Sequence, residues 1–206
     1  MAGDTAGDTA VAAGEHGEPR QSLPARLWCW FAPRLWFWLP WPVLVAIDLW
    51  SKSAVFAFMN AEHHGEFGRH EVFRSWFLSF DLVTWRNKGT IWGLFQDATI
   101  PLMVLRCGAV VWLLWYVTTA ARRTRLQLLI LSLIFAGAIG NLVDNFVQRD
   151  RAVRDFLRFS GNWPRDWDFP AFNVADSCIT VGAIGLILLL LREDRASGRA
   201  SKQVSS

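Results

Sequence analysis

The sequence predicts an all-α membrane protein with four transmembrane helices and a small extracytoplasmic β-element. Apolar residues make up 52 % of the 206 residues, and they are concentrated in blocks. Four blocks approach the ~20 residues that an α-helix needs to cross a bilayer. They cover residues 35–58, 100–121, 126–143 and 172–191. The alternative is a soluble helical protein with an unusually apolar core.

The four predicted spans differ in how many charges interrupt them. The first contains Asp48 and Lys52 as well as two prolines, and the second contains Arg106. The third and the fourth are free of charge except at one end, where they carry Asp144 and Asp176 respectively. The third and fourth spans are therefore the clearest, and the aspartates at their ends need an explanation.

Two long connections separate these spans. Residues 60–99 are too many for a simple connector, and their aromatic residues partly alternate with polar ones. This pattern predicts a few short strands that form a small sheet on the outer membrane surface. Residues 146–171 contain prolines beside bulky aromatic residues, which predicts an irregular segment along the membrane with room for one short helix.

Positive charge is distributed unevenly along the chain and predicts the topology. Arginine precedes the first span, fills the short connection between the second and third, and follows the fourth, whereas both long loops mix acidic and basic residues. The positive-inside rule places both termini in the cytoplasm and both long loops outside. We expect a disordered cytoplasmic tail at residues 1–25, the membrane domain at 26–191 and a polar cytoplasmic tail at 192–206.

Each span-end aspartate follows an asparagine by three positions, in Asn141-Leu-Val-Asp144 and Asn173-Val-Ala-Asp176. A carboxylate at the edge of a span is costly to keep, so it indicates a functional site. Because the third and fourth spans run in opposite directions, both carboxylates are predicted to emerge at the outer face. Two adjacent carboxylates can share one proton, as in aspartic proteases. The simpler interpretation, two helix-end residues in water, is disfavoured by the repeated motif.

Such a pair can hydrolyse a peptide bond without a nucleophilic side chain. The ionised aspartate would be the general base for a water molecule, and the protonated one would polarise the scissile carbonyl. Gly137 and Gly140 share the helix face of Asp144 and would let another helix approach closely. Neither GxSxG, HExxH nor a Walker loop occurs, which argues against serine hydrolases, zinc proteases and P-loop enzymes. The three cysteines have no metal-site or disulfide spacing.

Five sequence blocks together resemble the bacterial lipoprotein signal peptidase family, also called signal peptidase II. In chain order they are Asp48-Leu-Trp-Ser-Lys52, Asn87-Lys-Gly89-Thr-Ile-Trp92-Gly93, Gly140-Asn141-Leu-Val-Asp144, Val153-Arg-Asp155-Phe156 and Phe172-Asn173-Val-Ala175-Asp176-Ser177. They occur in the family's order and cover about residues 40–190. Each block alone is a weak signal, but the set is specific.

The resemblance implies an intramembrane aspartic peptidase of the bacterial inner membrane. It would cut prolipoproteins before a diacylglyceryl-modified cysteine, with membrane lipids around it and with no nucleic acid, metal or organic cofactor. Asp144 and Asp176 are the implied catalytic pair. The implied substrate-binding or supporting residues are Asp48, Lys52, Asn87, Gly89, Asn141, Asp155, Asn173 and Ala175.

One departure from the family pattern affects the predicted site. The family usually has arginine directly after the first aspartate, but here Asn145 follows, and Arg149 or Arg151 would have to supply the charge from the loop. A non-catalytic membrane protein therefore stays an alternative, whether a lipid-binding scaffold, a proton-coupled transporter or an inactive peptidase homologue. A transporter would be expected to carry its carboxylates near the middle of the membrane rather than at span ends.

Overall fold

The computed structural model describes residues 23, 28, 30–63, 68–89, 99–119 and 124–204. The chain divides into two units, Met1–Pro33 and Arg34–Ser206, and the second contains the membrane helices and the sheet. The predicted disordered tail lies almost entirely outside the described residues, as do Thr90, Ile91 and Trp92 of the second family block.

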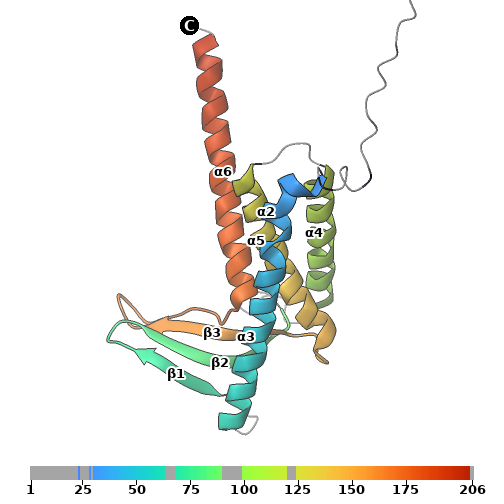
Figure 1. The fold of residues 1–206 in the computed structure, drawn as a ribbon. Coiled ribbons are helices and arrows are strands. Elements are labelled where there is room, and N and C mark those ends of the chain that lie inside the picture. Colours follow the sequence, from blue (N-terminus) through green and yellow to red (C-terminus); the bar gives the residue numbers. More distant parts are fainter. Residues whose placement is uncertain are drawn as a thin grey trace, which may run out of the picture. The chain divides into compact units, whose positions relative to one another are not determined.

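Four long helices confirm the predicted all-α membrane fold (Figure 1). The helical elements are η1 (Ala32–Arg34), α2 (Leu35–Trp38), α3 (Pro40–His63), α4 (Thr99–Thr119), α5 (Arg125–Val147) and α6 (Val174–Val204). The first candidate span, Ala32–Glu62, combines η1, α2 and most of α3. Helix α5 begins with a capping box, in which Thr124 and Gln127 each bond the other's backbone N–H group.

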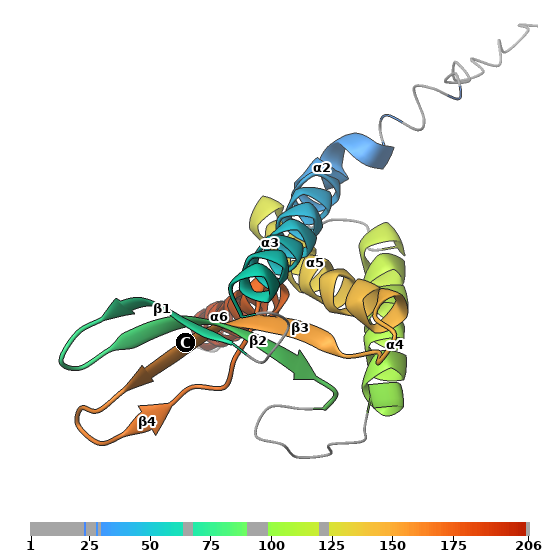
Figure 2. The same ribbon diagram turned by 90° about the horizontal axis from the view of Figure 1, so that it is seen from below.

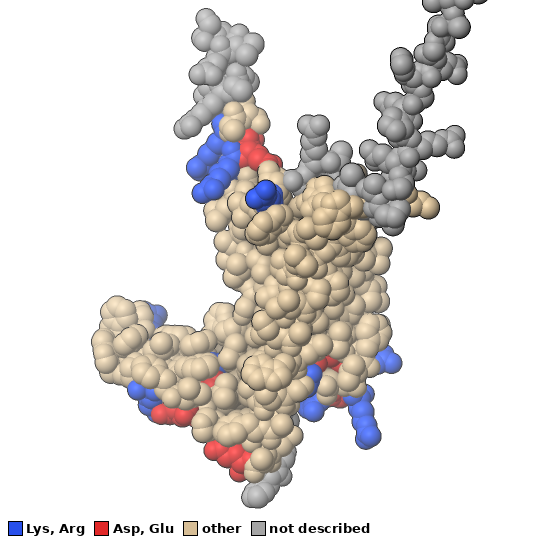
Figure 3. Space-filling view, viewed as in Figure 1, with Lys and Arg blue, Asp and Glu red and all other residues tan. Residues whose placement is uncertain are grey.

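Helix α5 is the centre of the bundle. It packs against α2, α3, α4 and α6. More than half of its apolar window, 56 %, is buried by protein, against 22 %, 11 % and 17 % for the other three spans. The other helices therefore direct apolar side chains such as Val104, Ile184 and Leu188 outward. On the face drawn in Figure 3 the helical part between the two charged ends carries no charge, as expected for a lipid-facing belt.

Glycines bring α5 and α6 into close contact. Gly137 lies against the carbonyl oxygen of Ala175, and Gly182 lies against Ile134. A Cβ atom at Gly182 would come within 2.5 Å of Cγ1 of Ile134, so no larger residue fits without movement. The prediction that small residues on the third span admit a neighbouring helix is confirmed.

A four-stranded antiparallel sheet of order β1-β2-β3-β4 lies at one end of the bundle, next to α3 (Figures 1 and 2). Strands β1 (Arg69–Arg74) and β2 (Ser79–Asn87) confirm the strands predicted in the first long loop. The prediction of an irregular second loop with a short helix was wrong. That loop contains β3 (Val153–Gly161), which pairs with β2, and the short β4 (Trp167–Asp168).

The second loop misled the sequence analysis because its pairing partner is distant in the chain. Asn87 pairs with Val153, and Ser79 pairs with Ser160, so the strand exists only when two loops meet. At the start of β3, Val153 and Asp155 are buried while Arg154 between them is less so, but Phe156 is buried too, so the alternation is only partial.

Helix α6 is longer than its apolar part. It continues through the predicted polar tail as far as Val204. The side chain of Gln127 on α5 donates a hydrogen bond to Glu193 Oε1 at 2.8 Å, which ties the first turn beyond the apolar part to the bundle. No proline or glycine lies between Gly185 and Gly198, so the helix has no reason to end with the apolar segment.

Candidate active site

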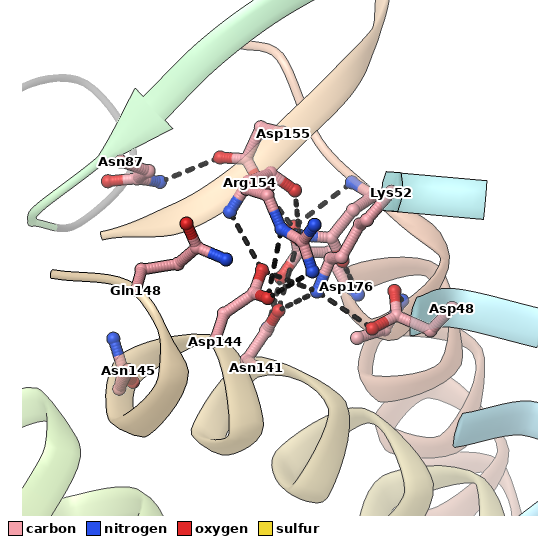
Figure 4. A network of polar contacts seen from close by, with 12 residues as sticks. Asp48, Lys52, Asn87, Asn141, Asp144, Asn145, Gln148, Arg154, Asp155 and Asp176 are labelled. Carbon is pink, nitrogen blue, oxygen red and sulfur yellow. Dashed lines mark hydrogen bonds and ion pairs between the residues drawn. The ribbon is translucent and has the colours of Figure 1, made fainter. Parts of the chain in front are cut away.

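Polar side chains from five elements meet where the helix bundle joins the sheet (Figure 4). Helix α3 contributes Asp48 and Lys52, β2 contributes Asn87, α5 contributes Asn141 and Asp144, β3 contributes Arg154 and Asp155, and the start of α6 contributes Asn173 and Asp176. Among these residues only Asn87, Arg154 and Asp176 are partly exposed, so the polar network is largely buried.

Lys52 is the central cation of the network and is fully buried. Its ammonium lies 2.7 Å from Asp48 Oδ2 and 3.3 Å from Asp144 Oδ2. It also donates a hydrogen bond to Asn141 Oδ1 at 3.1 Å. Three acceptors match its three N–H donors, so the charge is fully compensated. Asp48 and Lys52 are four residues apart on α3, a spacing that places an ion pair on one helix face.

Asp48 connects α3 to the start of α6. Its Oδ1 accepts a hydrogen bond from the backbone N–H of Ala175 at 2.9 Å. A carboxylate is favoured here because the first N–H groups of a helix have no partner within the helix. Gly140 makes room for the carboxylate, since a Cβ atom there would lie 2.6 Å from Asp48 Oδ2.

Asp144 is fully buried and doubly paired with cations. Its Oδ1 accepts hydrogen bonds from Nε and Nη2 of Arg154 at 3.1 and 2.8 Å. Its Oδ2 accepts one from the backbone N–H of Arg154 at 2.9 Å and lies beside Lys52. Three hydrogen bonds from Arg154 and one ion pair with Lys52 therefore engage both oxygens of this carboxylate.

Asn173 and Asp176 form a capping box at the start of α6. Asn173 Oδ1 accepts from the backbone N–H of Asp176 at 2.9 Å, and Asp176 Oδ2 accepts from the backbone N–H of Asn173 at 3.2 Å. Asp176 Oδ1 takes a further hydrogen bond from Asn141 Nδ2 at 2.8 Å. The two Asn-x-x-Asp motifs therefore have different roles, because Asn141 and Asp144 lie inside the last turns of α5.

Asp155 is buried among neutral donors. Its Oδ1 accepts from Asn173 Nδ2 at 2.6 Å, and its Oδ2 accepts from Asn87 Nδ2 at 3.0 Å. Burial, followed by the negative charge of Asp176, raises the pKa of Asp155 from 3.8 to about 7. The side chain of Asn173 thus touches Asp155 while its backbone holds Asp176. One residue sets the position of both carboxylates.

The structure brings together the catalytic and supporting residues that the family resemblance implied. Gly89 donates its backbone N–H to Asn87 Oδ1 at 3.0 Å, which closes the turn after β2 and orients the Asn87 side chain. Among the described residues, no cluster of three or more histidine, cysteine or acidic side chains is placed to hold a metal ion.

Two arginines belong to the site although the sequence did not identify them as site residues. Arg154 lies inside a family block beside Asp155, and strand alternation directs the two side chains to different partners. Arg106 of α4 donates a hydrogen bond to Asn145 Oδ1 at 2.6 Å. An arginine inside a predicted span was itself a signal for a functional role. Neither Arg149 nor Arg151, the expected substitutes, pairs with Asp144, and both are exposed.

Comparison with known proteins gives the family. The family model described as signal peptidase (SPase) II matches residues 41–192, about three quarters of the chain. The chain belongs to the signal peptidase II family. The match includes all five family blocks, so the resemblance seen in the sequence is confirmed.

Curated relatives of this signal peptidase II family member carry the name lipoprotein signal peptidase. The one from Clostridium tetani is 33 % identical over 118 residues, which is 57 % of this chain and 72 % of the relative. The one from Nitratidesulfovibrio vulgaris is 37 % identical over 118 residues, 55 % of this chain and 68 % of the relative. A solved bacterial membrane enzyme is similar with a TM-score of 0.60 and 27 % identity, over 75 % of this chain and 86 % of that one.

Proposed function

We propose that this protein is a prolipoprotein signal peptidase in which Asp155 and Asp176 are the catalytic pair. The observation that carries the proposal is Asn173, which bonds both carboxylates at once, Asp155 through its amide and Asp176 through its backbone. Among the described residues, no cation forms an ion pair with either carboxylate, whereas Asp144 is bound by Arg154 and Lys52. Family membership supports the peptidase activity.

The pair of Asp155 and Asp176 replaces the pair of Asp144 and Asp176 that the sequence suggested. A general base must contact the attacking water, and both carboxylate oxygens of Asp144 are engaged by Arg154 and Lys52 instead. A general acid must hold a proton near neutral pH, and the raised pKa of Asp155 meets this need. Asp144 would instead hold Arg154 and Lys52 in place, which in turn orient β3 and Asn141.

Hydrolysis needs one proton on the pair. Asp176, ionised and partly exposed, takes a proton from water as the oxygen attacks the scissile carbonyl carbon. Asp155 gives its proton to the carbonyl oxygen, and a gem-diol forms. The C–N bond then breaks as Asp176 passes its proton to the leaving nitrogen, and a hydroxyl proton of the gem-diol returns to Asp155. The products are a carboxylic acid and an amine, and the pair regains its initial state.

The position of the site suits a lipid-anchored substrate. The start of α6, which carries part of the site, lies next to the sheet (Figure 1), and charged side chains appear on the surface at that end of the apolar belt (Figure 3). A diacylglyceryl-modified cysteine of a prolipoprotein would keep its acyl chains in the bilayer and place the preceding peptide bond at this depth. Arg125 is the first residue of α5, and Arg192 directly follows the apolar part of α6, so both lie at the opposite end of the apolar segments from the site. This placement supports cytoplasmic termini and an outward-facing site in the inner membrane.

The decisive experiment compares three single variants on a diacylglyceryl-modified prolipoprotein. Asp155→Asn and Asp176→Asn should abolish cleavage before the modified cysteine while leaving the thermal unfolding midpoint of the purified protein near that of the wild type. Asp144→Asn should lower the unfolding midpoint, because Arg154 and Lys52 lose their shared partner. The fraction of Asp144→Asn that stays folded should keep measurable activity.

Two outcomes would contradict the proposal. Full activity of Asp155→Asn, together with a stable but inactive Asp144→Asn, would return the catalytic role to Asp144. Absence of cleavage by folded wild-type protein would favour an inactive homologue. Arg165→Gln serves as the control, since Arg165 is exposed and lies outside the network.

A further inference from the structure

Arg106 is a cation within a membrane-spanning helix that the catalytic scheme does not use. It lies in the second turn of α4, and its side chain is only partly buried. A charged residue at such a position is expensive and is retained for a function or for a strong partner. The partner found in the structure is neutral, the amide oxygen of Asn145 at 2.6 Å. Arg106 is therefore not explained by pairing.

Its charge acts on the catalytic pair without contact. The carboxylates that interact electrostatically with Arg106 are Asp176 first, then Asp155 and Asp144. None of the three forms an ion pair with it, although Asp144 has ion pairs with Arg154 and Lys52. The guanidinium is thus close enough to act on these carboxylates electrostatically without forming an ion pair with any of them.

The sum of charges in the network indicates why a third cation lies near the catalytic pair. Four carboxylates, Asp48, Asp144, Asp155 and Asp176, face the two contacting cations Lys52 and Arg154. With the proton on Asp155, three negative charges remain, so Arg106 is the third cation that makes the site neutral. It balances Asp176 from a distance and keeps most of its five N–H donors unused by the described residues.

We propose that Arg106 binds the substrate, donating hydrogen bonds from its guanidinium to main-chain carbonyl oxygens of the peptide segment that lies between α4 and the catalytic pair. Asn145 holds one Nη1 hydrogen of Arg106 and is itself fixed by donating to the carbonyl oxygen of Arg151 at 2.6 Å. The other N–H donors of Arg106 form no hydrogen bond with the described residues. A fork of donors matches an extended peptide, whose carbonyl groups have no partner in a membrane.

This inference rests on the proposed peptidase function, and its test separates the two. The variant is Arg106→Gln, whose amide can still donate to Asn145 Oδ1 but lacks the charge and the fork. Binding of an uncleaved diacylglyceryl-modified peptide is measured in the Asp176→Asn background, and cleavage is measured in the wild-type background. Because a hydrogen bond from a charged group is lost, we expect Kd and KM to rise about 10- to 100-fold with an unchanged unfolding midpoint.

Arg106→Lys keeps the charge without the fork and should weaken binding by an intermediate factor. Arg106→Leu, which suits a lipid-facing helix, is the second removal variant if glutamine unfolds the protein, and it should bind at least as weakly. Arg165→Gln should bind like the wild type. Unchanged Kd and KM in a folded removal variant would overturn the proposal, as would a loss of activity that follows only a lower unfolding midpoint. If wild type does not cleave at all, the proposed function fails, whereas the binding assay still tests Arg106.

Discussion

Replacement of Lys52 by methionine tests whether the buried ion network stabilises the fold. Lys52 is fully buried and compensates Asp48, which is 1 % exposed. Without the ammonium, Asp48 keeps only the backbone N–H of Ala175, while Asp144 still has Arg154. One carboxylate would therefore be buried without a cation. Breaking a buried pair in this way costs about 3–5 kcal/mol, so we expect Lys52→Met to lower the free energy of unfolding by that amount.

A second substitution should rescue much of the loss. In Lys52→Met with Asp48→Asn, the asparagine oxygen can still accept from Ala175 while the uncompensated charge is gone. We expect the double variant to recover more than half of the lost free energy of unfolding, since the remaining cost is one buried neutral amide. The assay is equilibrium unfolding of the purified protein in mixed micelles with increasing denaturing detergent.

Two outcomes would contradict a stabilising role for the charge of Lys52. A single variant that loses less than about 1 kcal/mol would show that water or a rearranged side chain compensates Asp48. A double variant as unstable as the single one would show that the loss comes from packing rather than charge. Lys88→Met is the matched control, because Lys88 is exposed, and it should change the free energy of unfolding by no more than about 0.5 kcal/mol.

Three further predictions concern Asp155 and Gly140. The pKa of Asp155 is about 7 in the folded protein and 3.8 ordinarily, so Asp155 keeps its proton in the fold up to about pH 7. Above that value kcat/KM should fall about tenfold per pH unit. A kcat/KM profile that stays flat to pH 9 would show that Asp155 is not the general acid. Because the folded state holds this proton more tightly than the unfolded state, the contribution of Asp155 to the free energy of unfolding should fall as the pH rises from 3.8 to about 7. Thermal unfolding midpoints measured across this range would detect the loss. Gly140→Ala should lower the free energy of unfolding by about 1–3 kcal/mol, because the new Cβ atom would lie 2.6 Å from Asp48 Oδ2 and 3.1 Å from Ala175 Cβ. The control Gly108→Ala, where nothing lies within 4 Å, should be neutral or up to about 1 kcal/mol stabilising, and equal losses in both variants would contradict close packing at Gly140.

The membrane fold was predictable because transfer from water to lipid depends on composition. The apolar blocks and the strand pattern of residues 69–87 are local features, and both appear in the structure. Strand β3 was missed because its backbone hydrogen bonds go to β2, more than sixty residues earlier. A strand whose partner is distant has little local signal beyond alternation, and prolines nearby obscured it.

The site was predictable as a set but not as a mechanism. Charged and amide side chains in or beside apolar segments are costly, so Asp48, Lys52, Asn141 and Asp176 could be identified as members from their positions alone. Two motifs share the spacing Asn-x-x-Asp, and this equal spacing suggested that their aspartates have equal roles. The spacing does not show that Asn173 precedes its helix and caps it, while Asn141 lies within one.

By itself the sequence determined the four spans, the family blocks and, apart from Arg154, the members of the polar network, because each depends on the chemical type of residues along the chain. Tertiary structure alone decided which carboxylates are neutralised. Strand β3 brings Arg154 to Asp144 and presents Asp155 to the neutral amides of Asn87 and Asn173. Electrostatic energy depends on distance between charges and on their burial, and neither quantity can be obtained from spacing in the chain.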